Sequence, residues 1–216
     1  MISGSKIRSE TGAADGGAFG TIGAVTWRRA CRGLLLAVAL GASSAWAFDL
    51  PDLMGLLAKQ KSGEARFTEQ RFVRGLEGPL NASGTLSFTA PDKLSRRTLT
   101  PRPESMVVDG NNMVLSRGER TRTMTLDSVP ELQGLVEAMR GTLSGDTAAL
   151  SRYFKSTVGG SADGWTLDLQ PLDNRLAAQV RSVRMSGRGS EVLGLDMEFV
   201  GGDRSVMTIV PTRSAP

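Results

Sequence analysis

The 216-residue chain contains no histidine, one cysteine and few aromatic side chains. Without histidine it lacks the usual general base at neutral pH, the commonest metal ligand, and any Ser-His or Cys-His nucleophile pair. It has no glycine-rich phosphate-binding loop either. We therefore predict no catalytic residue, no metal, no cofactor and no enzyme activity. A hydrolase that acts through carboxylates stays open, although no spacing of Asp and Glu singles out a pair.

Basic and acidic residues are interspersed along the chain and form no cluster of one sign. The formal net charge is +4, but five basic and two acidic residues precede Phe48 and account for +3 of it, so +1 remains for residues 48–216. Basic residues form no stripe with interleaved aromatics, which gives nucleic-acid binding little support.

Residues 28–47 have the pattern of a secretory signal peptide. Basic residues at 28–32 precede an apolar run at 33–42, and Ala45-Trp46-Ala47 supplies small residues for cleavage. The run is too short to span a bilayer. A buried core helix is the alternative, but it would have to be apolar on every face. We expect residues 1–47 to be an upstream extension plus a signal peptide cleaved after Ala47.

The position of the cysteine bears on what happens after cleavage. Cys31 precedes the apolar run, whereas a lipoprotein signal carries its cysteine just after that run. We therefore expect residues 48–216 to form a single domain with no lipid anchor and no disulfide. No later segment is apolar for about 18 residues. The product should be a soluble protein of a bacterial periplasm.

The periodicity of the remaining chain predicts few helices and many strands. Helical spacing follows Asp49 up to Gly63, and recurs over 128–141 and in a shorter segment after Asp146 that includes Leu150, Tyr153 and Phe154. Alternation predicts strands in the intervening segments, 66–73, 82–89, 94–100, 105–108, 113–115, 121–126, 165–170, around 183–185, 193–199 and up to about 210.

Consecutive hairpins favour one curved antiparallel sheet or an unclosed β-barrel. Two or three helices cannot surround such a sheet, so we expect a mainly β, α+β fold whose helices cover the concave apolar face. Glycines at 159–160 and 201–202 are expected in hairpin turns. Space between sheet and helices is where ligand pockets form.

Four short segments, in this order, resemble the LolA family of periplasmic carriers of outer-membrane lipoproteins. They are Ala65-Arg66-Phe67-Thr68-Glu69-Gln70, Gly84-Thr85-Leu86-Ser87-Phe88, Ala90-Pro91-Asp92-Lys93-Leu94 and Val107-Val108-Asp109-Gly110-Asn111-Asn112-Met113. Weaker similarity continues through Leu143-Ser144-Gly145-Asp146 and Trp165-Thr166-Leu167. The resemblance implies an unclosed barrel whose apolar interior holds acyl chains.

The resemblance also implies a lipid-binding cavity, although ordinary core packing is the alternative for each residue. The expected lining is Leu86, Phe88, Leu94, Val107, Met113, Met124, Leu126, Leu135, Met139, Leu195, Met197 and Phe199. Methionines, with Met106 and Met185 among them, would adapt to irregular chains.

One departure from the family concerns the lid. Typical members have an arginine before the turn proline that helps to latch the lid, and here that residue is Ala90. Arg96 or Arg97 could take over by pairing with a lid carbonyl or a lipid phosphate. Alternatively, both are solvated charges that discourage pairing at a strand edge.

The expected function is a monomeric periplasmic carrier that binds the acyl chains of a lipoprotein or lipid and shuttles this cargo from the inner to the outer membrane. Its expected partners are an inner-membrane exporter and an outer-membrane acceptor such as LolB, and no nucleic acid. Two alternatives are a LolA-like paralogue that serves export of a specialised lipid or polyene, and a lipid-sensing regulatory module that docks on a membrane partner.

Overall fold

The computed structural model describes residues 48–212, which belong to one unit, Ala47–Pro216. The expected extension and signal peptide lie outside the described residues. No helix in the described range is both long and apolar enough to cross a membrane. The elements are α2 (Leu50–Leu57), β1 (Ser62–Phe72), β2 (Leu80–Thr89), β3 (Lys93–Thr100), β4 (Glu104–Asp109), β5 (Asn112–Arg117), β6 (Arg120–Thr125), η1 (Leu126–Ser128), α3 (Pro130–Ser144), α4 (Thr147–Tyr153), β7 (Phe154–Ser161), β8 (Gly164–Pro171), α5 (Asn174–Ala177), β9 (Val180–Arg188), β10 (Glu191–Phe199) and β11 (Arg204–Thr212).

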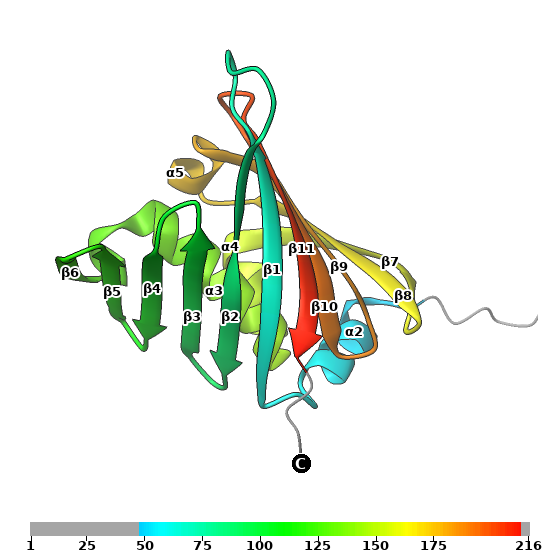
Figure 1. The fold of residues 1–216 in the computed structure, drawn as a ribbon. Helices are drawn as coiled ribbons and strands as arrows, with labels where there is room; N and C mark the ends of the chain where they lie inside the picture. Colours follow the sequence, from blue (N-terminus) through cyan, green and yellow to red (C-terminus); the bar gives the residue numbers. More distant parts are fainter. Residues whose placement is uncertain (1–47, 213–216) are drawn as a thin grey trace, which may run out of the picture. The chain divides into compact units, whose positions relative to one another are not determined.

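The strands of residues 48–212 form one antiparallel sheet in the order β6-β5-β4-β3-β2-β1-β11-β10-β9-β8-β7. The long strand β1 lies in the middle, where Ala65 pairs with Leu86 of β2 and Phe67 pairs with Ile209 of β11. It joins an N-terminal half, β2–β6, to a C-terminal half, β7–β11. Within the described residues β6 and β7 remain separate edges, so the sheet is not closed into a barrel (Figure 1). The predicted fold class is confirmed.

The helices lie on one face of this sheet, which we call the covered face (Figure 1). Its side chains alternate along each strand with those of the opposite, outer face. The covered face includes Leu86 and Phe88 of β2, which contribute to the apolar interior, whereas Arg66 and Arg97 lie exposed on the outer face.

The first described helix, α2, begins with the predicted cap. Asp49 and Asp52 form a capping box, in which each carboxylate accepts a hydrogen bond from the other residue's backbone N–H. The helix ends at Leu57, earlier than the predicted Gly63, because Gly63 already lies in β1 opposite Phe88 of β2. Sheet pairing takes precedence here over helical spacing.

The longest described helix, α3, connects the two edges of the sheet together with α4. It ends at Ser144, and its C-cap is Gly145, whose φ of +73° favours glycine. A Cβ at Gly145 would lie 2.4 Å from the carbonyl oxygen of Met54, so the end of α3 packs tightly on α2. The predicted end near Gly141 was wrong, since this glycine lies inside α3 and packs against the start of α4.

Four further features differ from what the sequence led us to expect. Phe154 begins β7 and does not belong to the preceding helix, and β7 itself was not predicted. Gly159 and Gly160 lie within β7, where a Cβ at Gly160 would be 2.1 Å from the carbonyl oxygen of Gly164 on β8. The short helix α5 was also missed. Small residues hide the strand pattern of β7, because alternation needs large apolar side chains to be visible.

Two clusters of buried side chains hold the helices against the sheet. In the C-terminal half, α2 and α4 pack on the strands around Trp165, Leu167 and Leu169. In the N-terminal half, Val136 of α3 packs on a smaller cluster, which consists of Phe88, Leu94, Val108, Met113 and Leu126. The two clusters lie on either side of the centre of the sheet, and the space between them forms the candidate site.

Candidate functional site

A cavity of about 1300 Å³ lies between the covered face of the sheet and α3. It exceeds the roughly 300–1,000 Å³ of pockets that hold drug-sized ligands. Its apolar lining comes from both halves of the sheet and from two helices. It includes Leu57, Ala65, Leu86, Phe88, Leu94, Met106, Leu115, Leu132, Leu135, Val136, Met139, Leu143, Met185, Val192, Leu195, Met197, Met207 and Ile209.

Simple alternation places these side chains in the cavity. On the strands, every second residue points to the covered face. On α3, the lining residues Leu132, Leu135, Val136, Met139 and Leu143 recur at intervals of three and four, which puts them on one side of the helix. An apolar stripe on a helix and an apolar face on a sheet therefore oppose each other, and they are not in full contact.

A polar group lies in the floor of this apolar cavity. The carboxylate of Glu69, on β1, is buried and accepts a hydrogen bond from the hydroxyl of Ser205 at 2.5 Å. Arg96, on β3, pairs with the other carboxylate oxygen, with 2.5 Å between Nη2 and Oε2. The Arg96 guanidinium also lies 4.8 Å from the ring centre of Phe67. This arrangement satisfies the buried charge and joins β1, β3 and β11 across the covered face.

Gly84 makes this arrangement possible. It lies on β2 between Phe67 and β3, at a register shift beside Ser83. A Cβ at Gly84 would lie 2.9 Å from the Phe67 ring and 1.9 Å from the carbonyl oxygen of Arg97. Only glycine leaves room for the aromatic ring and for the local backbone.

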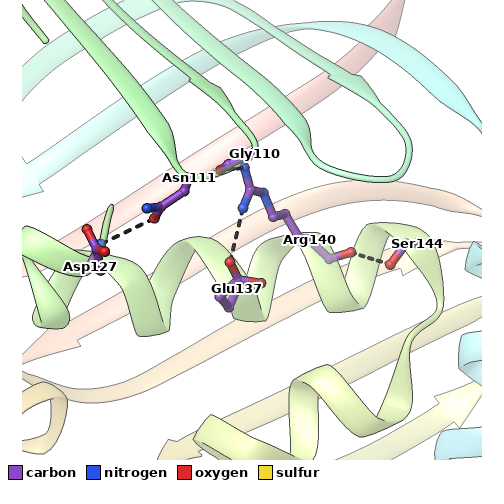
Figure 2. A network of polar contacts seen from close by, with 6 residues as sticks. All are labelled: Gly110, Asn111, Asp127, Glu137, Arg140 and Ser144. Carbon is purple, nitrogen blue, oxygen red and sulfur yellow. Dashed lines mark hydrogen bonds and ion pairs between the residues drawn. The ribbon is translucent and has the colours of Figure 1, made fainter. Parts of the chain in front are cut away.

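A second arginine attaches α3 to the sheet (Figure 2). The buried guanidinium of Arg140 donates to the carbonyl oxygen of Gly110 in the β4–β5 turn, with 2.6 Å between Nη2 and O. It also pairs with Glu137 one turn earlier, at 3.0 Å. The same turn also holds η1, which precedes α3. The Leu126 N–H donates a hydrogen bond to the Asn111 carbonyl oxygen at 2.8 Å.

The two ends of the cavity differ in charge. At the end formed by α2, the start of β1 and the β9–β10 turn, the lining includes Glu64 and Glu191. At the opposite end, formed by the β3–β4 loop and the β5–β6 hairpin, the lining includes four arginines and one acid, Arg102, Arg117, Arg120, Arg122 and Glu104.

The structure brings many of the predicted cavity residues together. The cavity lining includes Leu86, Phe88, Leu94, Leu135, Met139, Leu195 and Met197, with Arg96 among them. Met113, Met124 and Leu126 contribute instead to the packed cluster beneath α3, and Phe199 packs on the other cluster. Val107 pairs with Val114 and, like Arg97, does not line the cavity.

Sequence reasoning missed several lining residues. Met207 and Ile209 of β11 alternate visibly, so the strand pattern could have identified them. Arg140 falls within the apolar stripe of α3, four residues after Val136, and a charge in that position signals a buried partner. A β-bulge between Val192 and Gly194 of β10 could not be read from the sequence, and Val192 lines the cavity together with Leu195 and Met197, outside strict alternation.

Comparison with known proteins agrees with this geometry. A family profile described as outer membrane lipoprotein carrier protein LolA-like matches residues 42–211. The chain belongs to this LolA-like family. The recognised resemblance is thereby confirmed over nearly the whole described range, including both halves of the sheet and α3. No curated protein sequence matches the chain.

Several solved structures are also similar to the chain. LolA superfamily protein NE2245 from Nitrosomonas europaea is 10% identical, with 78% of this chain and 95% of that chain covered at a TM-score of 0.43. The MucA/MucB complex of Pseudomonas aeruginosa contains a chain that is 14% identical, with 77% of this chain and 58% of that chain covered at a TM-score of 0.41. The Clostridioides difficile CwlD amidase complex with the GerS lipoprotein contains a chain that is 10% identical, with 84% of this chain and 91% of that chain covered at a TM-score of 0.34. Family membership rests on the match to the LolA-like profile.

Proposed function

We propose that this protein is a periplasmic carrier that binds the acyl chains of a lipoprotein or lipid and shuttles this cargo from the inner to the outer membrane. The observation that carries the proposal is the cavity of about 1300 Å³, whose lining is mostly apolar and comes from the covered face of the sheet and from α3. Membership of the LolA-like carrier family supports it.

The energetics of the cavity suit acyl chains. Moving one methylene from water to an apolar site gains about 0.8 kcal/mol, so a sixteen-carbon chain gains on the order of 10 kcal/mol before the costs of association. Met106, Met139 and Met197 lie in the lining, and their unbranched side chains adapt to irregular shapes. No reacting group is needed for this task.

The family and the sequence support the proposed route of the cargo. The signal peptide at residues 28–47 would export the chain to the periplasm. There it would receive cargo from an inner-membrane exporter and release it to an outer-membrane acceptor such as LolB. A specialised lipid or polyene in place of a lipoprotein would use the same cavity.

Native mass spectrometry tests the proposal directly. The full chain is expressed in its own host, and its processed form is purified gently from the periplasm. We expect a discrete adduct whose mass distinguishes a lipoprotein from a free lipid. A bare protein mass, together with no binding of a fluorescent acyl probe, would contradict the carrier function and favour a module that docks on another protein.

A variant that fills the cavity tests whether the acyl chains bind there. Met106→Trp adds volume to the cavity lining, so we expect acyl-probe affinity to fall at least about tenfold while the protein stays folded. Leu99→Trp is the matched control, since Leu99 is exposed and is not part of the lining. Equal loss of affinity in both variants would place the probe elsewhere.

A further inference from the structure

The cavity has a basic end, which we define as Arg102, Arg117, Arg120 and Arg122. Arg102 lies in the β3–β4 loop, and the other three lie on the β5–β6 hairpin. All four side chains line the same cavity as Leu115 and Met106.

Strand register explains why these arginines adjoin the apolar lining. Arg122 of β6 is paired directly with Leu115 of β5, and Arg120 is paired with Arg117. Paired residues share a face, so Arg120 and Arg122 belong to the covered face, and Thr121 between them alternates with them along the strand. The edge strand β6 thus directs its charges toward the cavity.

Polarity changes steadily along β5. Met113 is fully buried beneath α3, Leu115 lines the cavity, and Arg117 reaches the basic end. At about 3.4 Å per residue, Met113 and Arg117 lie about 14 Å apart along the strand. An acyl chain that lies on the apolar part of the sheet would therefore bring its headgroup to the arginines.

The balance of charge at this end is positive. Glu104 pairs with Arg117, with 2.7 Å between Oε1 and Nε, and Glu119 lies in the β5–β6 turn. Among the side chains that the structure describes, Arg102, Arg120 and Arg122 form no ion pair. At the opposite end of the cavity the described lining, which includes Gln60, Glu64 and Glu191, contains no arginine or lysine.

We propose that the cavity selects acyl ligands with an anionic headgroup, whose negative charge is bound by Arg102, Arg120 and Arg122. Guanidinium groups suit phosphate and carboxylate oxygens because their donors form a planar fork. The proposal rests on the proposed acyl-carrier function and adds the ligand's charge and its orientation in the cavity.

The test compares two single-chain lipids with the same palmitoyl chain, lysophosphatidylglycerol and lysophosphatidylcholine. Each displaces a fluorescent acyl probe from the processed full-chain protein at low ionic strength. We expect the anionic lipid to bind at least about tenfold more tightly. The preference should shrink as salt is added, because the arginines are exposed to solvent.

The decisive variant is Arg120→Gln/Arg122→Gln. Near a surface each basic residue contributes about fivefold to the binding of an anionic lipid, so most of the preference should disappear while lysophosphatidylcholine binds as before. Arg66→Gln/Arg97→Gln is the matched control. It removes the same charge from exposed positions on the outer face, and it should keep the preference.

Each other outcome has a definite meaning. Equal affinity of the wild-type protein for the two lipids would overturn the headgroup site and leave the carrier function standing. Loss of the preference in the control variant would mean that the preference depends on the protein's net charge and not on these arginines. That result would also overturn the headgroup site. Binding of neither lipid would contradict the carrier function itself. The last ligand tested is glycerol phosphate, which has no acyl chain. If it bound as tightly as lysophosphatidylglycerol, the arginines would form a site for a free phosphate.

Discussion

The two halves of the sheet use their covered faces differently. In the C-terminal half, α2 and α4 pack against the strands, and the side chains of Trp165, Leu167 and Leu169 are completely buried. In the N-terminal half, α3 is attached near the β4–β5 turn through Val136 and Arg140, and a cavity remains between α3 and the sheet that extends past β1 to the inner strands of the C-terminal half, β9–β11. One sheet therefore combines a filled core, which stabilises the fold, with an unfilled space that can hold a ligand.

Removing matched leucines from the two halves should give the largest contrast. Leu167 is fully buried in the filled core, so Leu167→Ala should lower the free energy of unfolding by about 2–5 kcal/mol. Leu115 lines the cavity and is only partly buried, so Leu115→Ala should cost below about 1 kcal/mol. Urea unfolding of both variants checks this, and equal losses would refute the contrast.

The next prediction concerns the ion pair in the cavity floor, where the halves meet. Arg96→Met leaves the Glu69 carboxylate buried without its cation and should cost about 2 kcal/mol, below the roughly 3–5 kcal/mol of a fully buried pair because Arg96 is partly exposed. The double variant Glu69→Leu/Arg96→Met should recover most of the loss. Chemical denaturation of both variants measures it, and no recovery would mean that Arg96 acts mainly by packing on Phe67.

The attachment of α3 can be weakened at one point. Arg140→Met removes the hydrogen bond to the Gly110 carbonyl, and we expect a loss of about 1–3 kcal/mol. Because α3 is the cover of the N-terminal half, amide hydrogen exchange should quicken in α3 and in the β4–β5 turn while β8 and β9 stay protected. Uniform loss of protection would contradict separate attachment of the two halves.

The smallest effect should come from acid at the start of the α3 segment. Hydrogen bonds from the side chains of Thr125 and then Asn111 hold the pKa of Asp127 below its usual value. Its contribution to stability is therefore complete above the unfolded-state value near pH 4, and it is lost as the pH falls through the lower folded-state value. Asp127→Asn should flatten the fall in stability between about pH 4 and 2. An unchanged slope in acid unfolding curves would contradict this.

The helix and hairpin signals of this chain were readable because they depend on neighbouring residues. The Asp49 cap, the Gly110 turn between β4 and β5, and the stripe on α3 each involve residues a few positions apart. Strand β7 was not readable, since its small residues show no alternation. The cavity residues were predicted where alternation was regular, as at Leu86 and Leu195, and not where a bulge put Val192 in the lining.

The polar residues of the site depended on pairing that no local pattern determines. Arg96 and Arg97 are adjacent, yet register places Arg96 in the cavity and leaves Arg97 outside the lining. Glu69 meets Ser205 across 136 positions of sequence. A slip of one residue in β3 would exchange the two arginines between faces.

By itself, the sequence determined the class of fold, its LolA-like family, the apolar stripes, and the absence of histidine and thiol chemistry from residues 48–216. These properties follow from composition and from contacts between residues close in the chain. Only the tertiary structure decided that the core around β8 is filled while a cavity remains over the middle of the sheet and its N-terminal half, that Arg140 attaches α3, and that one end of the cavity is basic. Those outcomes depend on the register between strands and on the distance between helix and sheet, because side chains far apart in sequence meet only after the whole sheet has formed.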